Sequence, residues 1–309
     1  MKAVRIHQYG SEDTLKYEDA PLPEIAPDDV LIKVKAASVN PVDWKIQAGY
    51  LKDMIPHQLP LTLGWDVSGV IEAVGDNVSG FKIGDEVYSR PNIARNGTFA
   101  EYVAVNVREI AFKPKTMDHH HAAGLPLAGL TAYQALFDIA KVQAGQTVLI
   151  HAAAGGVGSL AVQMAKIAGA TVMGTASARN KDFLLELGVD TVIDYTTEEF
   201  ETVASNVDMV FDTIGGETQE KSWQVLKEGG LMVSIVAPPS ADKAKEANAR
   251  GEFLFIEPNG EQLTKMAQWV DAGVLTNNIE KTFPLDQVEQ AFALSQTGRT
   301  RGKIIIQVA

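Results

Sequence analysis

The stretch Val148-Leu-Ile-His-Ala-Ala-Ala-Gly-Gly-Val-Gly-Ser159 determines the fold class of this chain. Its first residues are apolar and predict a buried strand, and the small residues after them predict a tight turn into a helix over about 157–168. A second strand is expected at 171–175, which is the spacing of a βαβ unit. The stretch therefore indicates a nucleotide-binding α/β unit, although a tight strand-to-helix turn without a ligand would use the same residues.

The glycines of this turn predict a phosphate site. A helix that begins after glycines presents unpaired backbone N–H groups and the positive end of its dipole, which favours a pyrophosphate. Gly155 would let the backbone approach the phosphates, and Gly158 would let the helix pack closely on the strand. The usual fingerprint begins with glycine where this chain has Ala153, so the pattern is A-x-G-x-x-G. The residues expected at the diphosphate are Ala154, Gly155, Gly156 and Val157.

The residues at the end of the second expected strand bear on the choice of cofactor. Proteins that bind NAD usually place Asp or Glu there to bind the ribose 2′-hydroxyl, whereas this chain has Ala176 and Ser177. Arg179 and Lys181 follow closely, and either cation could meet a 2′-phosphate. We therefore expect NADPH rather than NADH, with an exposed basic loop as the alternative explanation.

The composition limits the classes of function. The chain has 309 residues, enough for two domains, and a net charge of −12, which argues against nucleic acid as a partner. It contains no cysteine, which excludes disulfides, thiolate zinc sites and thiol nucleophiles. Apolar runs are short and the first residues lack a signal-peptide core, so we expect a cytoplasmic protein without a membrane span.

The pattern of expected elements divides the chain. The first third is β-rich, with strands expected at 1–6, 29–36, 67–74, 86–89 and 102–105. From residue 147 strands and helices alternate, which implies a parallel sheet with helices on both faces. We expect a strand at 303–308 to return to the first part. The predicted domains are therefore a β-rich one at 1–123 and 260–309, and an inserted nucleotide-binding one at 124–259.

Seven motifs, in this order and spacing, resemble the medium-chain dehydrogenase/reductase superfamily. They are Ser38-Val-Asn-Pro-Val-Asp-Trp44, Gly64-Trp-Asp-Val-Ser-Gly-Val70, Gly84-Asp-Glu-Val87, Gly97-Thr-Phe-Ala-Glu-Tyr102, Gly129-Leu-Thr-Ala-Tyr133, Ala152-Ala-Ala-Gly-Gly-Val-Gly158 and Arg301-Gly-Lys-Ile304. The resemblance covers essentially the whole chain and is closest to the zinc-free quinone oxidoreductase branch, the zeta-crystallin-like proteins. It implies an α/β protein with a GroES-like β-rich catalytic domain and a Rossmann doubly wound parallel sheet.

The departures from the zinc-dependent members of this superfamily concern the metal. Those members resemble this chain but carry Cys near the position of Asn40 and His near that of Trp65, and neither ligand is present here. The segment between Val87 and Gly97 is too short for the lobe that holds their structural zinc. The resemblance therefore implies no metal site and poor alcohol oxidation, because no Lewis acid would stabilise an alkoxide.

The resemblance and the local chemistry suggest three catalytic candidates. Asn40 could donate an amide hydrogen bond to a substrate carbonyl and stabilise enolate charge. Asp43 could orient Asn40, bind solvent or fix the following helix, and both residues also suit a plain turn and N-cap. Tyr50 could donate a proton or stack on a quinone ring, and an ordinary half-buried tyrosine is the alternative. Trp65 could line an apolar pocket or simply pack in the core.

Further cofactor contacts are implied by the resemblance. Thr131 corresponds to a position near the nicotinamide, and Tyr195 to one near the 2′-phosphate beside Ser177. Ile235 ends the fifth strand of the sheet, where backbone groups could meet the nicotinamide amide. Lys303 resembles a lysine near the cofactor, although it could only be the polar start of a strand.

The function implied is NADPH-dependent, zinc-independent transfer of hydride to a quinone or an α,β-unsaturated carbonyl, with the proton donor left open. An enoyl-thioester reductase and a non-catalytic NADPH-binding regulatory protein are the alternatives. The segment Phe253-Leu-Phe-Ile256 is expected to be an edge strand that pairs with its twin in a homodimer. His119-His120-His121 is expected to be a solvated helix start, since consecutive helical histidines cannot face one ion.

Overall fold

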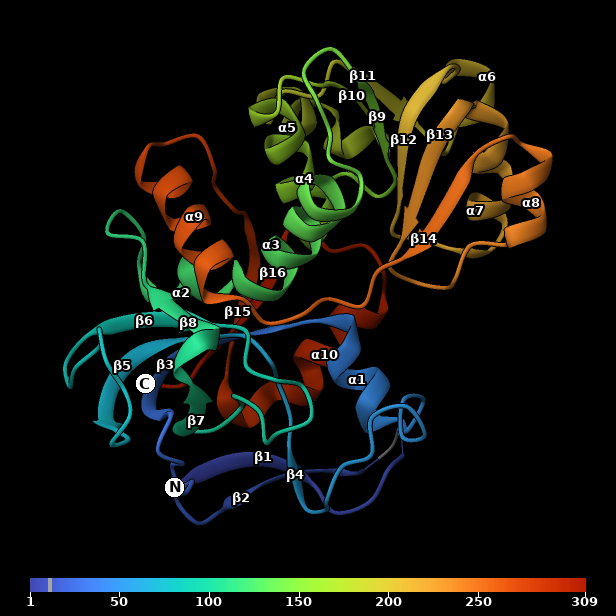
Figure 1. Ribbon diagram of the computed structural model, residues 1–309. Helices are drawn as coiled ribbons and strands as arrows, with labels where there is room; N and C mark the ends of the chain where they lie inside the picture. Colours follow the sequence, from blue (N-terminus) through green and yellow to red (C-terminus); the bar gives the residue numbers. More distant parts are fainter. Residues whose placement is uncertain (11–12) are drawn as a thin grey trace. The chain divides into compact units, whose positions relative to one another are not determined.

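The computed structural model describes residues 1–10 and 13–309 (Figure 1). Their contacts group the chain into two compact units. Unit 1 comprises Met1–Leu130, Glu257–Gly273 and Asn277–Ala309, and unit 2 comprises Thr131–Ile256 and Val274–Thr276. The predicted domain boundaries at 123/124 and 259/260 stay a prediction.

Unit 2 is a parallel sheet with the strand order of a Rossmann fold. In the described part of the chain the order is β11-β10-β9-β12-β13-β14, and every neighbouring pair is parallel. This is the order 3-2-1-4-5-6 of a doubly wound sheet, in which ligands bind at the carboxyl ends of the central strands. The strands are β9 Thr147–Ile150, β10 Thr171–Ala176, β11 Thr191–Asp194, β12 Val207–Asp212, β13 Leu226–Ser234 and β14 Arg250–Phe253. The prediction of this fold is confirmed.

The helices of unit 2 connect these strands in sequence. They are α4 Gly156–Ile167, α5 Lys181–Glu186, α6 Phe200–Val203, α7 Gly216–Ser222 and α8 Ala241–Glu246 (Figure 1). Before them, the chain enters the unit through α3 Pro126–Tyr133 and a π-helical segment at Gln134–Ile139. The strand β9 is apolar along its length because it is buried at the centre of the sheet, with Val148, Leu149 and Ile150 fully enclosed.

The described strands of unit 1 pair in the antiparallel sense, apart from β15 and β16, which are parallel. Its main sheet has the order β15-β16-β3-β5-β6-β8, with β7 also paired to β3, and a smaller sheet has the order β2-β1-β4. The bounds are β1 Lys2–Ile6, β2 Leu15–Asp19, β3 Asp29–Val39, β4 Leu61–Thr62, β5 Val67–Val74, β6 Glu86–Ser89, β7 Tyr102–Asn106, β8 Ile110–Phe112, β15 Ile279–Pro284 and β16 Lys303–Gln307. The last strand β16 pairs with β3 near the beginning of the chain, as predicted from the sequence.

The helices of unit 1 are α1 Pro41–Gln47, α2 His119–Ala123, α9 Gly260–Asp271 and α10 Val288–Gln296. Two large apolar clusters lie in this unit, and α1 and α10 contribute to the first of them. One cluster gathers Trp65, Phe99 and Phe292 with the start of β16, and the other lies among Val34, Val67 and their neighbours in β3, β5 and β6. Trp65 is fully buried here, so the packing interpretation of this residue holds.

The register of the main sheet brings polar residues to one of its ends. Val39 pairs with Ile304, Ala37 with Val67, and Val67 with Ser89. The residues that follow or precede these strand ends are therefore neighbours across the sheet. They are Asn40 after β3, Asp66 before β5, Arg90 after β6 and Lys303 at the start of β16.

Two sequence predictions near residue 250 were wrong. The charge pattern predicts a helix over 242–250, but the helix ends at Glu246, because Asn248 adopts a left-handed φ of 49° that a helix cannot continue through. The edge strand is Arg250–Phe253, so only Phe253 of the expected strand Phe253–Ile256 belongs to it. Within this strand, Gly251 packs closely on Pro239, since a Cβ at Gly251 would lie 2.7 Å from Cβ of Pro239.

Within residues 1–10 and 13–309, no helix is both long and apolar enough to cross a lipid bilayer.

Candidate functional site

The predicted phosphate turn is present between β9 and α4. Ala152 takes a left-handed φ of 48°, and the chain then turns so that Gly155 is the N-cap and Gly156 the first residue of α4. Gly155 lacks a side chain, so the N-cap supplies no side-chain hydrogen bond to the helix N-terminus. The first N–H groups of a helix have no partner within it. A turn of this kind suits the diphosphate of a dinucleotide.

The close packing expected at Gly158 is also present. A Cβ on Gly158 would lie 2.4 Å from the carbonyl oxygen of Ala152 and 2.7 Å from Cα of Ala153. On the neighbouring strand, a Cβ on Gly174 would lie 2.8 Å from Cβ of Ala153. By contrast, a Cβ on Gly155 would lie 3.3 Å from its nearest neighbour, the carbonyl oxygen of Ala152. The fold therefore requires glycine at 158 and is much less restrictive at 155.

His151 supports this turn from beneath, and the sequence analysis missed it. Its ring nitrogens contact the hydroxyls of Thr175 at 3.2 Å and Ser222 at 2.9 Å, and its ring meets Phe200 edge-on. The Thr175 hydroxyl also accepts the N–H of Ala152 at 3.1 Å. Burial lowers the pKa of His151 to about 4, so the ring is neutral at neutral pH. A histidine at the end of an apolar strand was the available signal.

The ends of β10 and β11 lie side by side and carry the residues expected at the adenosine. Ala176 pairs with Asp194, and the N–H of Tyr195 donates to the Ala176 carbonyl, so Ser177 and Tyr195 follow adjacent strand ends. Tyr195 is 61% exposed, and Arg179 and Lys181 are exposed on the turn into α5. The carboxylate of Asp194 accepts hydrogen bonds from the N–H and hydroxyl of Thr196. No carboxylate follows β10 itself among residues 176–181.

The ends of β12 and β13 are held by Asp212. Its buried carboxylate accepts from the N–H groups of Ile214 and Gly215 and from the side chains of Gln219 and Ser234. Through these contacts Asp212 fixes the conformation of the loop that follows β12. Ile235, immediately after β13, is partly exposed at this edge. Thr131, where unit 2 begins, is buried in α3. Cofactor contacts by these residues stay predictions.

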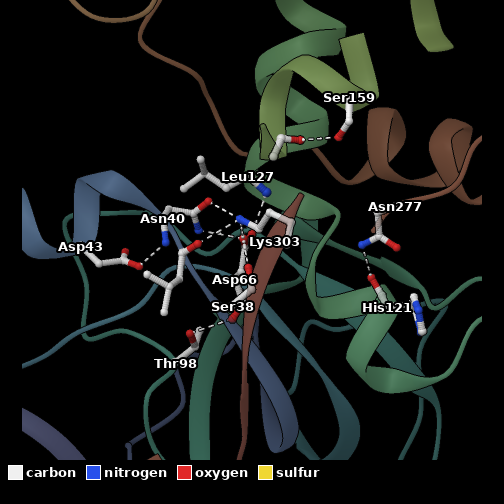
Figure 2. Close-up of polar contacts among 12 residues, drawn as sticks. Ser38, Asn40, Asp43, Asp66, Thr98, His121, Leu127, Ser159, Asn277 and Lys303 are labelled. Carbon is white, nitrogen blue, oxygen red and sulfur yellow. Dashed lines mark hydrogen bonds and ion pairs between the residues drawn. The ribbon is translucent and has the colours of Figure 1, made fainter. Parts of the chain in front are cut away.

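In unit 1, Asn40 lies in a buried polar network with Asp66 and Lys303 (Figure 2). The Asn40 Nδ2 group donates to Oδ2 of Asp66 at 2.8 Å, and its Oδ1 accepts from Nζ of Lys303 at 2.5 Å. Lys303 also donates to the Val39 carbonyl at 3.1 Å, and its Nζ lies 3.4 Å from Oδ2 of Asp66. All three residues are at most 4% exposed.

Asp66 joins this network to two further elements. Its Oδ2 accepts the hydroxyl of Ser38 at 2.6 Å, and its Oδ1 accepts the N–H of Leu127 at 2.6 Å, at the start of α3. Burial raises the pKa of the Asp66 carboxyl, and the Lys303 ammonium together with these hydrogen bonds opposes that rise. Asp66 was considered only as a member of the motif Gly64–Val70, although a carboxylate directly before a buried strand is a usable signal.

Asp43 closes the first turn of α1 against Asn40. Its Oδ2 accepts the Asn40 N–H at 2.7 Å, whereas its Oδ1 has no partner in the described parts of the chain. Burial raises the pKa of Asp43 well above its usual range, and the Asp66 charge adds to the effect. The contact fits two of the expected roles, orienting Asn40 and fixing the helix. Participation of Asp43 in the chemistry stays a prediction.

Other candidates lie elsewhere in unit 1. Tyr50 is 73% exposed in the segment after α1, and its catalytic role stays a prediction. Arg90, which the sequence analysis missed, is buried after β6, and its Nε has no hydrogen-bond partner among the residues described. Burial lowers the pKa of this guanidinium, and the Asp66 and Glu109 carboxylates oppose the shift.

The three histidines begin α2, and each has a different environment. His119 contacts the Ser68 hydroxyl at 2.8 Å, and His121 contacts Asp118, the N-cap of the helix. Across residues 1–10 and 13–309, no cluster of three or more His, Asp or Glu side chains is arranged to hold a metal ion. The prediction that the protein binds no zinc stays a prediction.

Comparisons with known proteins identify the family. Residues 26–115 match the family model "Alcohol dehydrogenase GroES-like domain", and residues 187–306 match "Zinc-binding dehydrogenase". The chain is 39% identical over 320 residues to 2-methylene-furan-3-one reductase of Solanum lycopersicum, covering 99% of this chain and 79% of that protein. It is 38% identical over 322 residues, with the same coverage, to the chloroplastic NADPH-dependent alkenal/one oxidoreductase of Arabidopsis thaliana.

A solved structure agrees with these relatives. The quinone oxidoreductase from Coxiella burnetii superposes with a TM-score of 0.93 at 38% identity, covering 100% of this chain and 99% of that one. The chain belongs to the medium-chain dehydrogenase/reductase superfamily. Within that superfamily it falls in the quinone oxidoreductase branch, as its motifs predicted.

Proposed function

We propose that this protein is an NADPH-dependent, zinc-independent oxidoreductase that reduces a quinone or an α,β-unsaturated carbonyl. The observation that carries the proposal is the glycine turn at the N-terminus of α4, whose backbone donors suit a dinucleotide diphosphate. Relatives at 38–39% identity are named for reduction of an alkenal or enone and of 2-methylene-furan-3-one. NADPH, when bound, supplies a hydride from C4 of its nicotinamide.

The chain's own residues favour the phosphorylated coenzyme. Ser177 stands where a carboxylate would repel a 2′-phosphate, and the cations of Arg179 and Lys181 lie exposed just beyond it. Tyr195, at the end of the next strand, offers a ring face and a hydroxyl to the same group. Ala154, Gly155, Gly156 and Val157 bind the diphosphate through their backbone. Thr131 and Ile235 remain proposed contacts on the nicotinamide side. Lys303 resembles a lysine near the cofactor, but its ammonium lies within 3.4 Å of three protein oxygens, so we do not assign it a contact with the coenzyme.

Asn40 holds the substrate oxygen in this proposal. Hydride addition to the β-carbon of a conjugated carbonyl moves an electron pair to the carbonyl oxygen and gives an enolate. An amide N–H aimed at that oxygen stabilises the negative charge as it develops. The α-carbon then takes a proton, which solvent supplies, and the saturated ketone leaves with the oxidised coenzyme.

The proposal is tested by following NADPH oxidation with quinones, enones and enoyl thioesters, with NADH as a parallel donor. We expect turnover with quinones or enones, at least tenfold faster with limiting NADPH than with limiting NADH. Tight NADPH binding without turnover on any acceptor would instead support a regulatory binding protein. Zinc measured at one atom per purified chain would contradict zinc independence.

We also propose a homodimer that forms through β14. This strand is at the edge of the unit 2 sheet, and its described partner is β13. Phe253 in this strand and Phe255 just beyond it are more than a third exposed, and an open strand edge readily pairs with another. Light scattering at micromolar concentration should give twice the monomer mass, and a monomer would contradict this.

The cytoplasmic location stays a prediction, tested by cell fractionation.

A further inference from the structure

We propose that Lys303 is a positioning residue that acts through Asn40, holding and polarising its amide so that an N–H faces the substrate oxygen. Asp66 completes the arrangement by fixing the other end of the amide. The inference rests on the proposed function, because it assigns a task to the amide during carbonyl reduction. It concerns buried contacts within unit 1 alone (Figure 2).

The chemistry of the two partners fixes the direction of the amide. An ammonium can only donate, so the Asn40 atom 2.5 Å from Nζ of Lys303 must be the oxygen. The Asn40 Nδ2 group is 2.8 Å from a carboxylate oxygen of Asp66, and it donates to that oxygen. Nδ2 carries two hydrogens, and Asp66 takes one of them. The second hydrogen of Nδ2 remains available as a donor, and a substrate carbonyl oxygen can accept it.

The fold holds Lys303 at this position. Ile304 pairs with Val39 in the main sheet, so Lys303 lies beside Asn40 as a result of strand register. Its ammonium has three hydrogens, and three oxygen acceptors lie within 3.4 Å, on Val39, Asn40 and Asp66. Because these hydrogens are directed at oxygens of unit 1, we infer that Lys303 serves to orient the Asn40 side chain.

The positive charge also changes the strength of the amide as a donor. A cation bound to the amide oxygen draws electron density from nitrogen through the conjugated amide, so the remaining N–H becomes a stronger donor. Hydrogen bonds in such chains strengthen one another by roughly 10–30%, and burial preserves the effect. The network therefore increases the affinity of Asn40 for an oxygen that gains negative charge during the reaction.

A set of substitutions separates this role from direct cofactor binding. Lys303→Gln keeps a donor but removes the charge, Lys303→Arg keeps the charge, and Lys303→Met removes both. We expect kcat to fall about 10- to 100-fold in Lys303→Gln and Lys303→Met, less in Lys303→Arg, with the Kd for NADPH within twofold of wild type. Lys113→Met is the matched control, because Lys113 is a buried lysine bound to the Pro114 and Met117 carbonyls, and its kcat should not change.

A double-mutant cycle shows whether Lys303 acts through Asn40. Asn40→Ala should lower kcat about 10²- to 10³-fold, as loss of one oxyanion donor does. Adding Lys303→Gln to Asn40→Ala should then cost nothing further, because residues that act as a unit are not additive. If the kcat loss of the double variant equalled the product of the two single losses, the proposal would be overturned. A tenfold weaker NADPH affinity in Lys303→Gln with unchanged kcat would also overturn it.

A spectroscopic measurement keeps the proposal testable without turnover. The side-chain amide ¹⁵N resonance of Asn40, assigned by its loss in Asn40→Ala, should move in Lys303→Gln and stay in Lys113→Met. An unmoved resonance overturns the polarising role, whatever the substrate. Failure of every acceptor with wild-type enzyme would instead refute the proposed function. Lys303→Arg and Lys303→Gln retain a donor for Asp66, so we expect both variants to fold, and their melting temperatures will check this.

Discussion

The substitution Gly158→Ala tests the glycine turn most sharply, because it adds a single methyl group at the tightest approach of α4 to β9. That methyl carbon would lie 2.4 Å from the carbonyl oxygen of Ala152, about 1 Å inside an ordinary contact. Both neighbouring atoms, this oxygen and Cα of Ala153, belong to the backbone. The clash cannot be relieved by rotating a side chain, so the helix must shift away from the turn.

The expected magnitudes follow from that shift. Overpacking of this kind costs roughly 1–3 kcal/mol, and alanine regains about 1 kcal/mol of helix propensity over glycine. The net loss of up to about 2 kcal/mol should lower Tm by roughly 2–8 °C. Displacing the amide donors by about 1 Å should also raise the Kd for NADPH tenfold or more, since a misplacement of that size can cost about 10²-fold.

The assays are thermal melting and titration of NADPH fluorescence, with Gly155→Ala as the matched control for stability. Gly155 has a φ of −76°, and a methyl there would lie 3.3 Å from the Ala152 carbonyl oxygen rather than 2.4 Å, so this variant should lose much less stability than Gly158→Ala. If Gly158→Ala melted like wild type and bound NADPH with unchanged affinity, the close packing would not shape the cofactor site.

Three further predictions concern pH, coenzyme choice and catalysis. The pKa of His151 in the folded chain is about 4, against 6.5 for an ordinary histidine. Between these two pH values His151 is therefore protonated in the unfolded chain and neutral in the folded one. The unfolding free energy should therefore fall as pH drops from 6.5 to 4, by up to about 3 kcal/mol, and urea titrations of His151→Gln should lose that part of the slope. Removing Arg179 and Lys181 together should raise the KM for NADPH at least tenfold and leave that for NADH within threefold; equal effects on both coenzymes would refute their role at the 2′-phosphate. Asn40→Ala should lower kcat with enones about 10²-fold or more while the NADPH Kd stays constant, and an unchanged kcat would remove Asn40 from the reaction.

The order of strands and helices could be predicted because short apolar strands and longer helical segments are easily told apart in this sequence. The alternation of apolar strands and helices after Thr147 defines a parallel sheet, and the Rossmann strand order followed. The glycine spacing identified the turn, because a glycine at 158 is needed wherever a helix packs this closely on a strand. The errors lie at the sheet edge near residue 250, where a left-handed Asn248 ends a helix that charge pattern alone extends.

The polar network could not be predicted, because it depends on strand register across distant parts of the chain. Asn40, Asp66 and Lys303 are separated by up to 263 residues and meet only because β16 pairs with β3 and β3 with β5. The motifs identified single candidate residues, but they did not predict which residues contact one another. His151 and Arg90 were missed for the same reason, since their roles are defined by residues that pack around them in space.

The most direct test of the account is to follow the label when NADPH deuterated at nicotinamide C4 reduces an enone in the presence of a metal chelator. Hydride transfer to a conjugated carbonyl predicts deuterium at the β-carbon of a saturated ketone, a proton from water at the α-carbon, and a rate that the chelator does not change. Deuterium on the carbonyl carbon of an alcohol, or activity lost to the chelator and restored by zinc, would contradict it.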